Sequence, residues 1–157
     1  MGEGTPLSLA PDRMRALRSQ VLSEFPKLSD SFVLTSLPDE RYNCVAWAAE
    51  DTARWWWPDV DREAYWPAGV EREETVAGFV RAFATLRFEP CSSSELEPGF
   101  QRIAVFAIGD KPKHMARQLS SGTWTSKLGE WWDISHALDE VESLIYGKRV
   151  ILMRRAE

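Results

Sequence analysis

The sequence has few cysteines and no long apolar run. Cys44 and Cys91 are the only cysteines among 157 residues, which excludes a disulfide framework and makes a reducing cytoplasm the expected compartment. The first residues lack the basic start and apolar centre of a signal peptide. No stretch approaches the roughly 18 apolar residues of a membrane-spanning helix. We therefore predict a cytoplasmic protein without a membrane partner, and a non-classical route of export stays open.

Motifs for metals, phosphates and serine hydrolases are also missing. The two cysteines and the two histidines, His114 and His136, lack the short ligand pairs of zinc sites. The chain has no glycine-rich phosphate loop and no G-x-S-x-G elbow. We therefore expect neither a metal ion nor a cofactor.

Positive charge is in short supply. The formal net charge is -5, which disfavours a general nucleic-acid binder, because neutralising phosphates needs a cationic face. The charge is uneven, with 11 acidic and 5 basic residues over residues 50–97, and five basic residues against Asp110 alone over residues 101–129. No nucleic-acid partner is expected.

Aromatic residues, by contrast, are plentiful. The 44% of apolar and 27% of charged residues suit an ordinary globular protein, and the length suits one domain over residues 1–157. Residues 1–10 are expected to form a loose tail. Residues 51–72 form a Trp-rich insert that holds four of the eight tryptophans, three of them consecutive at positions 55–57. Those three cannot all face one interior, so at least one is expected to line a groove or a partner surface.

Hydrophobic periodicity predicts an α+β domain. Residues 101–108, 113–119 and 123–128 alternate or are rich in Ile, Val and Phe, and tight turns separate them, as in an antiparallel meander. We expect a core helix carrying Cys44 to pack on an antiparallel sheet of about four or five strands, with further helices at the periphery. The other expected elements are helices at 12–23, 74–86 and 133–146, a strand or extended arm at 32–37, and a last strand at 149–153.

Cys44 is the main candidate for chemistry. Asn43 is a good N-cap, so Cys44 lies in the first turn of the core helix, which is expected to end before Trp57. The unpaired N–H groups and the dipole at a helix start favour a thiolate, the form that acts as a nucleophile. The alternative is a buried cysteine that only fills apolar space.

His114 is the candidate base. It lies at the start of a predicted strand, from which it could reach the start of the core helix and accept the thiol proton. His136 falls in the first turn of the predicted helix at 133–146 and is interpreted as a surface or capping residue. A third group often orients the imidazole, and Ser126, Thr125 and Asp133 all remain candidates for it.

Asn43 and the tryptophans are candidates for substrate contacts. The amide of Asn43 could help the Cys44 N–H to bind a developing oxyanion, or its side chain is used up as the helix cap. Exposed indoles suit flat ligands and sugar rings, and Trp47, Trp57 and Trp124 are the candidates to line such a site.

The order of these parts resembles papain-like cysteine hydrolases of the bacterial NlpC/P60 and CHAP type. The similarity rests on Tyr42-Asn43-Cys44-Val45-Ala46-Trp47-Ala48, on His114-Met115-Ala116-Arg117-Gln118 and on Gly122-Thr123-Trp124-Thr125-Ser126-Lys127-Leu128-Gly129, and covers residues 41–129. It implies a papain-like fold in which Cys44 is the nucleophile and His114 the base. The third residue would map near Ser126, where those families have His, Asn or Asp. The Trp-rich insert has no counterpart in the resemblance.

The leading hypothesis is a cysteine-dependent amide hydrolase or acyltransferase with a Cys44–His114 dyad. Its partner would be a peptide or another amide-containing substrate, and peptidase, amidase and deamidase activities share the chemistry. One alternative is a non-catalytic module on the same scaffold that binds a peptide or glycan in a tryptophan groove. Another is a protein-interaction domain, marked by a large exposed apolar patch near Trp55 to Trp66.

Overall fold

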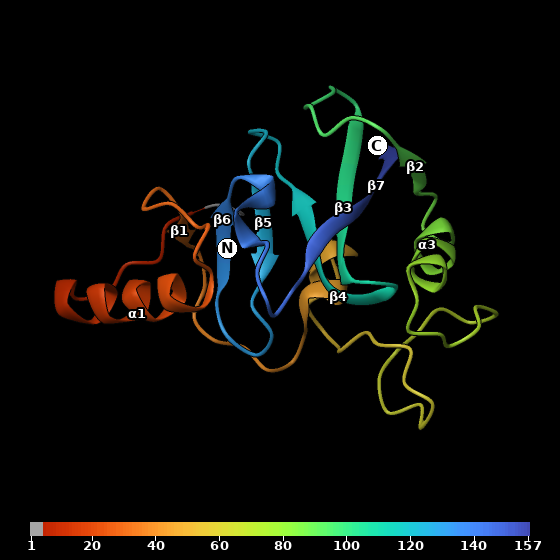
Figure 1. Ribbon diagram of the computed structural model, residues 1–157, viewed down its shortest axis with the longest axis horizontal. Coiled ribbons are helices and arrows are strands. Elements are labelled where there is room, and N and C mark those ends of the chain that lie inside the picture. Colours follow the sequence, from red (N-terminus) through yellow and green to blue (C-terminus); the bar gives the residue numbers. More distant parts are fainter. Residues whose placement is uncertain (1–4) are drawn as a thin grey trace.

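The computed structural model describes residues 5–157 and contains one antiparallel sheet of seven strands (Figure 1). Residues 1–4 of the expected tail lie outside the described residues. The strand order across the sheet is β1-β6-β5-β4-β3-β7-β2. The strands are β1 (Val33–Leu34), β2 (Glu89–Cys91), β3 (Phe100–Ile108), β4 (Lys111–Gln118), β5 (Trp124–Lys127), β6 (Asp133–His136) and β7 (Lys148–Ala156).

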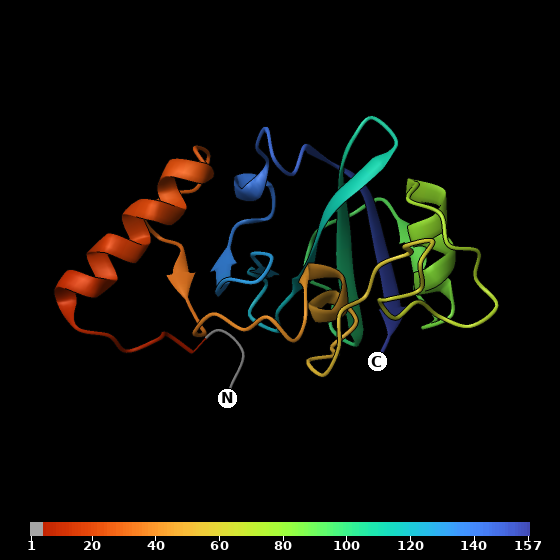
Figure 2. The same ribbon diagram turned by 90° about the horizontal axis from the view of Figure 1, so that it is seen from below.

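Helices contribute little of the architecture. Helix α1 lies at one end of the molecule and α3 at the other, while α2 packs against β4 and β5 near the middle (Figure 2). Within residues 5–157, no helix is both long and apolar enough to cross a membrane. The helices are α1 (Pro11–Glu24), α2 (Cys44–Ala48), α3 (Val76–Ala84) and the single 3₁₀ turn η1 (Leu138–Val141).

The predicted papain-like α+β fold, with a core helix on four or five strands, is wrong. The helix that carries Cys44 has only five residues, and the sheet has seven strands. Helix α2 stops early because Glu50 adopts a left-handed φ of 61°, which closes a Schellman motif. In that motif the Asp51 N–H donates to Ala46 O and the Glu50 N–H donates to Trp47 O.

The predicted helix over residues 133–146 is also wrong. These residues form strand β6, the turn η1 and an irregular segment that leads into β7. Ile134 and Val141 have helical spacing but fill the same core from a strand and a 3₁₀ turn. The backbone of β6 bonds to β5 on one side and to β1 on the other, and such long-range pairing cannot be read from local periodicity. Strand β2, which carries Pro90 at the sheet edge, was not predicted.

The other predicted elements are confirmed to within a few residues. Helices α1 and α3 and strands β3, β4, β5 and β7 overlap the ranges that the sequence patterns indicated. Thr75 caps α3 by accepting a hydrogen bond from the Gly78 N–H. The inward face of α3 presents Phe79 and Phe83, both fully buried.

One face of the sheet carries the α2–α3 core. It joins both helices to alternate residues of β3, β4 and β7 and to the Trp-rich insert, whose Trp56 and Trp66 are buried while Trp55 and Trp57 stay half-buried. Its buried residues are Tyr42, Cys44, Val45, Ala46, Ala48, Trp56, Trp66, Phe79, Ala82, Phe83, Phe88, Ile103, Val105, Met115 and Met153.

The opposite face carries the α1 core. Successive residues of a strand point to opposite faces, so Ala104 and Ala116 belong to this core while their neighbours Val105 and Met115 belong to the other. Its buried residues are Val21, Phe25, Leu28, Phe32, Leu34, Ala104, Phe106, Ala116, Trp124, Leu128, Trp132, Ile134, Val141 and Leu152.

Candidate active site

The candidate site lies where the sheet is least continuous. Strands β4 and β5 pair only through Arg117 with Thr125 and Gln118 with Trp124, whereas β5 pairs with β6 along its whole length. Beyond this short ladder no backbone pairing joins β4 to β5, so side chains make the connection between them. Cys44 and His114 both lie near this split.

Cys44 opens α2 at the split, where its thiol is buried, with 7% of the residue exposed. Burial raises the pKa of the Cys44 thiol to about 11, although hydrogen bonds from the backbone of Met115 and Val45 oppose the rise. The resting group is therefore a neutral thiol and not the thiolate that its place at a helix start suggested. A helix of five residues offers too weak a dipole to offset the loss of hydration.

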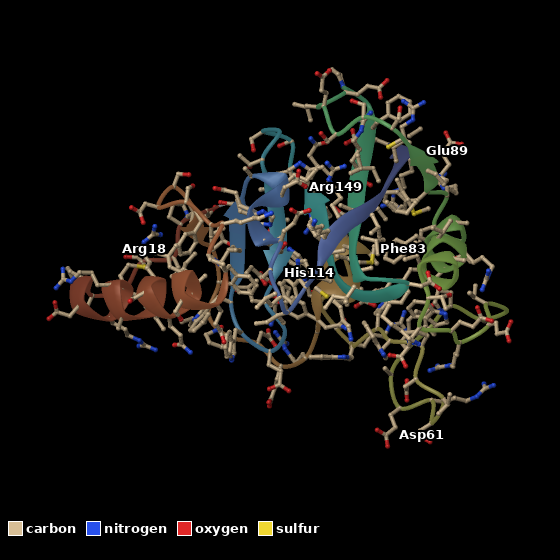
Figure 3. All side chains as sticks on the ribbon, viewed as in Figure 1. Arg18, Asp61, Phe83, Glu89, His114 and Arg149 are labelled. Atoms are coloured by element: carbon tan, nitrogen blue, oxygen red, sulfur yellow. The ribbon has the colours of Figure 1, made fainter. Side chains whose placement is uncertain are left out.

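His114 is fully buried on β4. Because it alternates with Met115, its side chain points toward the α1 core, away from the face that α2 covers. Its ring stacks in parallel on Tyr146, with centroids 4.0 Å apart and an interplanar angle of 3°, and Phe106 lies at 5.5 Å. Figure 3 places His114 near the centre of the molecule.

A buried chain of three side chains crosses β4, β5 and β6. His114 Nε2 lies 2.8 Å from the Ser126 hydroxyl, and the same hydroxyl lies 2.7 Å from His136 Nε2. His136 Nδ1 lies 2.6 Å from the carbonyl oxygen of Ala137. All three side chains are at least 96% buried. We call His114, Ser126 and His136 the histidine chain.

His136 corrects the interpretation made from the sequence. It was expected on the surface or as a cap, but it is 4% exposed and lies on β6, not in a helix. Burial lowers the pKa of its imidazole to about 4. Its role was missed because the helix predicted over residues 133–146 put it in the wrong element. His136 lies two residues after Ile134, and this strand-like spacing was the signal that could have placed both side chains on the same buried face.

The thiol and the imidazole lie on different faces of the sheet, near the same segment of β4. The Cys44 thiol is held against the backbone of Met115, the residue after His114. Tyr146 borders the pocket that Cys44 lines and also covers the ring of His114. No hydrogen bond joins Cys44 to His114 here, and His114 Nδ1 is a buried atom without a hydrogen-bond partner.

Asp133 and Thr125, the other candidates for the third residue, belong to different contacts. Asp133 accepts a hydrogen bond from the Tyr42 hydroxyl at 3.1 Å, and burial raises the pKa of its carboxyl to about 6. The Thr125 hydroxyl donates to Ile134 O and accepts from Trp47 Nε1. Ser126 is the one of these candidates that contacts His114.

Lys127 is a buried residue that the sequence reading did not single out. Its ammonium group donates to the carbonyl oxygens of Asp39, Gly129 and Trp131 at 2.6, 2.8 and 2.7 Å. It also lies 5.0 Å from the centroid of the Tyr42 ring. The three N–H donors of Lys127 thus meet three acceptors. The only sequence signal for its burial was its place inside a short strand.

The side chain of Asn43 is used in structural hydrogen bonds. Its side-chain oxygen accepts from the Ala46 and Trp56 N–H groups, and its amide nitrogen donates to Trp56 O at 2.7 Å. It therefore caps α2 and ties that helix to the Trp-rich insert. Of the candidate tryptophans, Trp57 lines the pocket beside Cys44, whereas Trp124 is buried in the α1 core. Trp47 stacks on Tyr42, away from that pocket.

Cys44 lines a pocket of about 340 Å³, which we call the cysteine pocket. Its walls combine two half-buried indoles with a single cation, since Lys113 is exposed at its edge. Such a lining suits a small ligand with a flat or apolar part and an anionic group. The other lining residues are Asn43, Trp55, Trp57, Gly129 and Tyr146.

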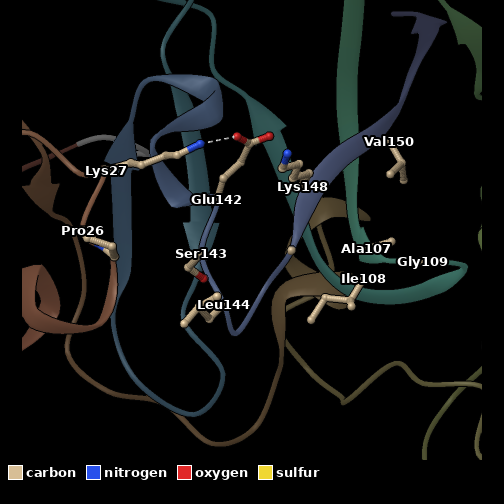
Figure 4. Close-up of a pocket in the computed structure, with 11 residues that line it drawn as sticks. Pro26, Lys27, Ala107, Ile108, Gly109, Glu142, Ser143, Leu144, Lys148 and Val150 are labelled. Atoms are coloured by element: carbon tan, nitrogen blue, oxygen red, sulfur yellow. Dashed lines mark hydrogen bonds and ion pairs between the residues drawn. The ribbon is translucent and has the colours of Figure 1, made fainter.

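A larger apolar groove of about 750 Å³ lies at the turn end of the β3–β4 hairpin (Figure 4). Leu144, which is 98% exposed, lies at its edge together with Ile108 and Val150. Lys27 and Glu142 form an ion pair of 2.8 Å across one end. Residues 143–147, which also carry Tyr146, lie between this groove and the cysteine pocket.

No group of three potential metal ligands occurs among residues 5–157. Cysteine, histidine and carboxylate side chains are therefore not gathered as a transition-metal site requires. What the site offers is a neutral thiol, a neutral imidazole and a buried hydroxyl between two histidines.

Comparison with known proteins gives a family but no activity. A family model with the description Domain of unknown function (DUF7689) matches residues 33–154, which include Cys44 and the whole histidine chain. No curated protein and no solved structure matches the chain.

Proposed function

Because the chain belongs to the DUF7689 family, whose description names no activity, we propose its function from the site alone: a cysteine-dependent hydrolase or acyltransferase that acts on an amide or a related acyl compound. Cys44 is the nucleophile and His114 the general base. The observation that carries the proposal is His114 Nδ1, a fully buried basic nitrogen without a hydrogen-bond partner. It belongs to the residue before Met115, whose backbone contacts the thiol.

A buried polar atom without a partner is costly, at about 1–3 kcal/mol. Proteins tolerate such atoms chiefly where they have a task. A bare imidazole nitrogen is a proton acceptor, and the Cys44 thiol, which is held against the backbone of the next residue, Met115, is the candidate donor. Proton transfer between the two needs the side chains to close to about 3 Å, a tightening that is common when substrate binds.

The reaction starts from neutral partners. Burial raises the pKa of Cys44 and lowers that of His114, so the thiol gives its proton to His114 Nδ1 only as sulfur bonds to the acyl carbon. The C–N bond then breaks, and the same proton passes to the leaving amine. Water or a second amine then attacks the resulting thioester and gives up a proton of its own, which passes by way of His114 Nδ1 to the departing Cys44 sulfur. Hydrolysis and transfer differ only in this second acceptor.

The test uses an activated acyl compound, p-nitrophenyl acetate, and a Cys91→Ser background in which Cys44 is the only thiol. We expect an acetyl group on Cys44 by intact mass and release of p-nitrophenolate. Replacing His114 with Gln should slow acetylation by at least about 100-fold, the contribution of a general base. Cys44→Ala should abolish it.

Alkylation provides the matched control. Iodoacetamide reacts with the thiolate that is already present, and a raised pKa leaves little of it at neutral pH. Alkylation of Cys44 should therefore be slow and insensitive to His114→Gln. Acetylation that is equally fast with and without His114, in folded protein, would contradict the proposal.

A binding function is the second candidate, and the apolar groove favours it. Leu144 is 98% exposed and Ile108 is 47% exposed, and contiguous apolar surface of this kind marks interaction sites. The groove is on the α1 side, so the patch expected near Trp55 to Trp66 is not the one found. Anilinonaphthalene sulfonate, an anionic aromatic probe, should bind the wild type and lose affinity in Leu144→Asp. Unchanged probe binding in Leu144→Asp would remove this candidate.

A further inference from the structure

The histidine chain ends on a group that can only accept a hydrogen bond. The carbonyl oxygen of Ala137 lies 2.6 Å from His136 Nδ1, so this nitrogen must carry a proton. A bare nitrogen there would set two lone pairs against each other. One backbone carbonyl thus fixes the first proton of the chain.

The second proton follows from the charge of His136. Burial keeps this imidazole neutral at neutral pH, although Glu140 on η1 acts in the opposite direction. A neutral imidazole has one N–H, which Nδ1 already holds, so His136 Nε2 is an acceptor. The Ser126 hydroxyl, 2.7 Å away, therefore donates to it.

The third proton follows from the serine. Ser126 has a single O–H, which it gives to His136, so its oxygen can only accept from His114 Nε2 at 2.8 Å. His114 is neutral as well, because burial and the neighbouring His136 both lower its pKa. Its Nε2 holds the only proton, which leaves Nδ1 bare.

We infer that His136 is a positioning residue that acts through the Ser126 hydroxyl to hold His114 in the tautomer with a basic Nδ1. The chain works in one direction, from the carbonyl of Ala137 to the open nitrogen of His114. Stacking on Tyr146 fixes the plane of the His114 ring, and the hydrogen bond to Ser126 fixes its rotation within that plane. The inference deepens the proposed function, since it states how the base is prepared.

A serine relay also explains why the base stays neutral at rest. A carboxylate beside Nε2 would stabilise the imidazolium and raise the pKa of His114. Asp133, the nearest candidate carboxyl on β6, is instead bonded to Tyr42. Neutral partners on the Nε2 side keep the lone pair of Nδ1 available, and the proton is taken up only during the reaction.

The tautomers can be read directly, because His114 and His136 are the only histidines. Nitrogen-15 NMR of the full chain at neutral pH separates protonated from bare ring nitrogens, and one histidine variant assigns both signals. We expect His114 with its proton on Nε2 and His136 with its proton on Nδ1. His114 with its proton on Nδ1 would overturn the inference.

Two variants test the direction of control. Ser126→Ala removes the acceptor for His114 Nε2, and His136→Phe frees the Ser126 proton to turn toward His114. In each variant we expect the form of His114 with a proton on Nδ1 to appear. Ser36→Ala, which removes another buried serine hydroxyl that accepts from the Asp133 N–H, should leave the tautomer unchanged. A tautomer that survives both Ser126→Ala and His136→Phe would overturn the inference.

The NMR spectra and the acetylation assay test separate claims. The tautomers are a property of the resting protein, so they decide the role of His136 whether or not Cys44 reacts. Acetylation of Cys44 decides the proposed function. Should Ser126→Ala not fold, the wild-type spectrum and His136→Phe still decide the inference.

Discussion

Ser126 and Lys127 are neighbours on β5 that point to opposite faces of the sheet, and each anchors a buried polar network. On the side of α2, Lys127 offers three N–H donors and meets three backbone carbonyls. On the side of α1, the histidine chain runs through Ser126 and stops at His114 Nδ1, which has no partner.

Under the proposed function, the difference separates a structural network from one prepared for a reaction. Lys127 holds together the loops at Asp39 and at residues 129–131, and its hydrogen-bonding capacity is filled. The histidine chain leaves one buried ring nitrogen, His114 Nδ1, without a partner and so carries a cost in free energy. A polar network in which every donor and acceptor is paired stabilises the fold, whereas a buried polar atom without a partner marks a candidate reactive group.

The largest expected effect is on the closed network. Lys127→Met removes a buried ammonium group that donates to three part-buried carbonyls, and at about 1 kcal/mol for each lost hydrogen bond the free energy of unfolding should fall by about 3 kcal/mol. Urea denaturation measures this. Lys113→Met, at an exposed lysine of β4, should stay within about 0.5 kcal/mol of the wild type. A loss below about 1 kcal/mol for Lys127→Met would refute its anchoring role.

Opening the histidine chain should cost less. Ser126→Ala removes one hydroxyl and two hydrogen bonds, for which we expect a loss of about 1–3 kcal/mol in the free energy of unfolding. Ser120→Ala, at an exposed serine nearby in the sequence, should change it by less than about 0.5 kcal/mol. If Ser126→Ala were the more damaging of the two network variants, the contrast drawn above would be reversed.

Acid should act on His136 and Asp133 with opposite signs. The folded pKa of His136 lies near 4, below its ordinary value of 6.5. The unfolded chain therefore binds an extra proton between these values, and stability falls as the pH is lowered. The folded pKa of Asp133, beside Lys127, lies near 6, above its ordinary 3.8, so its contribution to stability increases as the pH falls through 6.

Variants separate these two contributions. His136→Phe should flatten the acid-induced loss of stability, by up to about 1.4 kcal/mol per pH unit within the window, and Asp133→Asn should steepen it. Denaturation by urea at several pH values between 4 and 6.5 measures both slopes. Identical slopes in the two variants would show that the assigned signs are wrong.

The smallest effect on stability is expected at Tyr146. Tyr146→Phe keeps the ring stacked on His114 and should change the free energy of unfolding by less than about 0.5 kcal/mol. Tyr146→Ala should expose the open nitrogen to water and move the pKa of His114 upward toward 6.5. An NMR titration of His114 distinguishes the two, and an equal pKa in both variants would mean that Tyr146 does not shield the nitrogen.

Much of the local structure was readable from the sequence. Alternation and turn residues predicted β3, β4 and β5, and Asn43 was identified as the cap of the helix that carries Cys44. The periodicity of Phe79 and Phe83 predicted α3. These features depend on neighbours within a few residues, where spacing and side-chain chemistry are sufficient.

The wrong predictions concern segments whose backbone forms hydrogen bonds with strands far away in the sequence. Ile134, Leu138, Val141 and Ile145 have helical spacing, but pairing with β1 and β5 draws residues 133–136 into the sheet. His136 moved with them from an expected helix surface into the interior. The short length of α2 was not predicted either, because Glu50 ends the helix by adopting a left-handed φ, which its residue type does not indicate.

The sequence by itself identified the residues with reactive side chains, which are two cysteines and two histidines, and it predicted the strand that holds Ser126 and Lys127. Only the tertiary structure decided the electrostatics of those groups. Burial keeps Cys44 a neutral thiol. Folding also gives the Lys127 ammonium group its backbone acceptors and leaves His114 Nδ1 without a hydrogen-bond partner. The physical reason is that hydration and hydrogen-bond partners depend on packing between segments far apart in the chain.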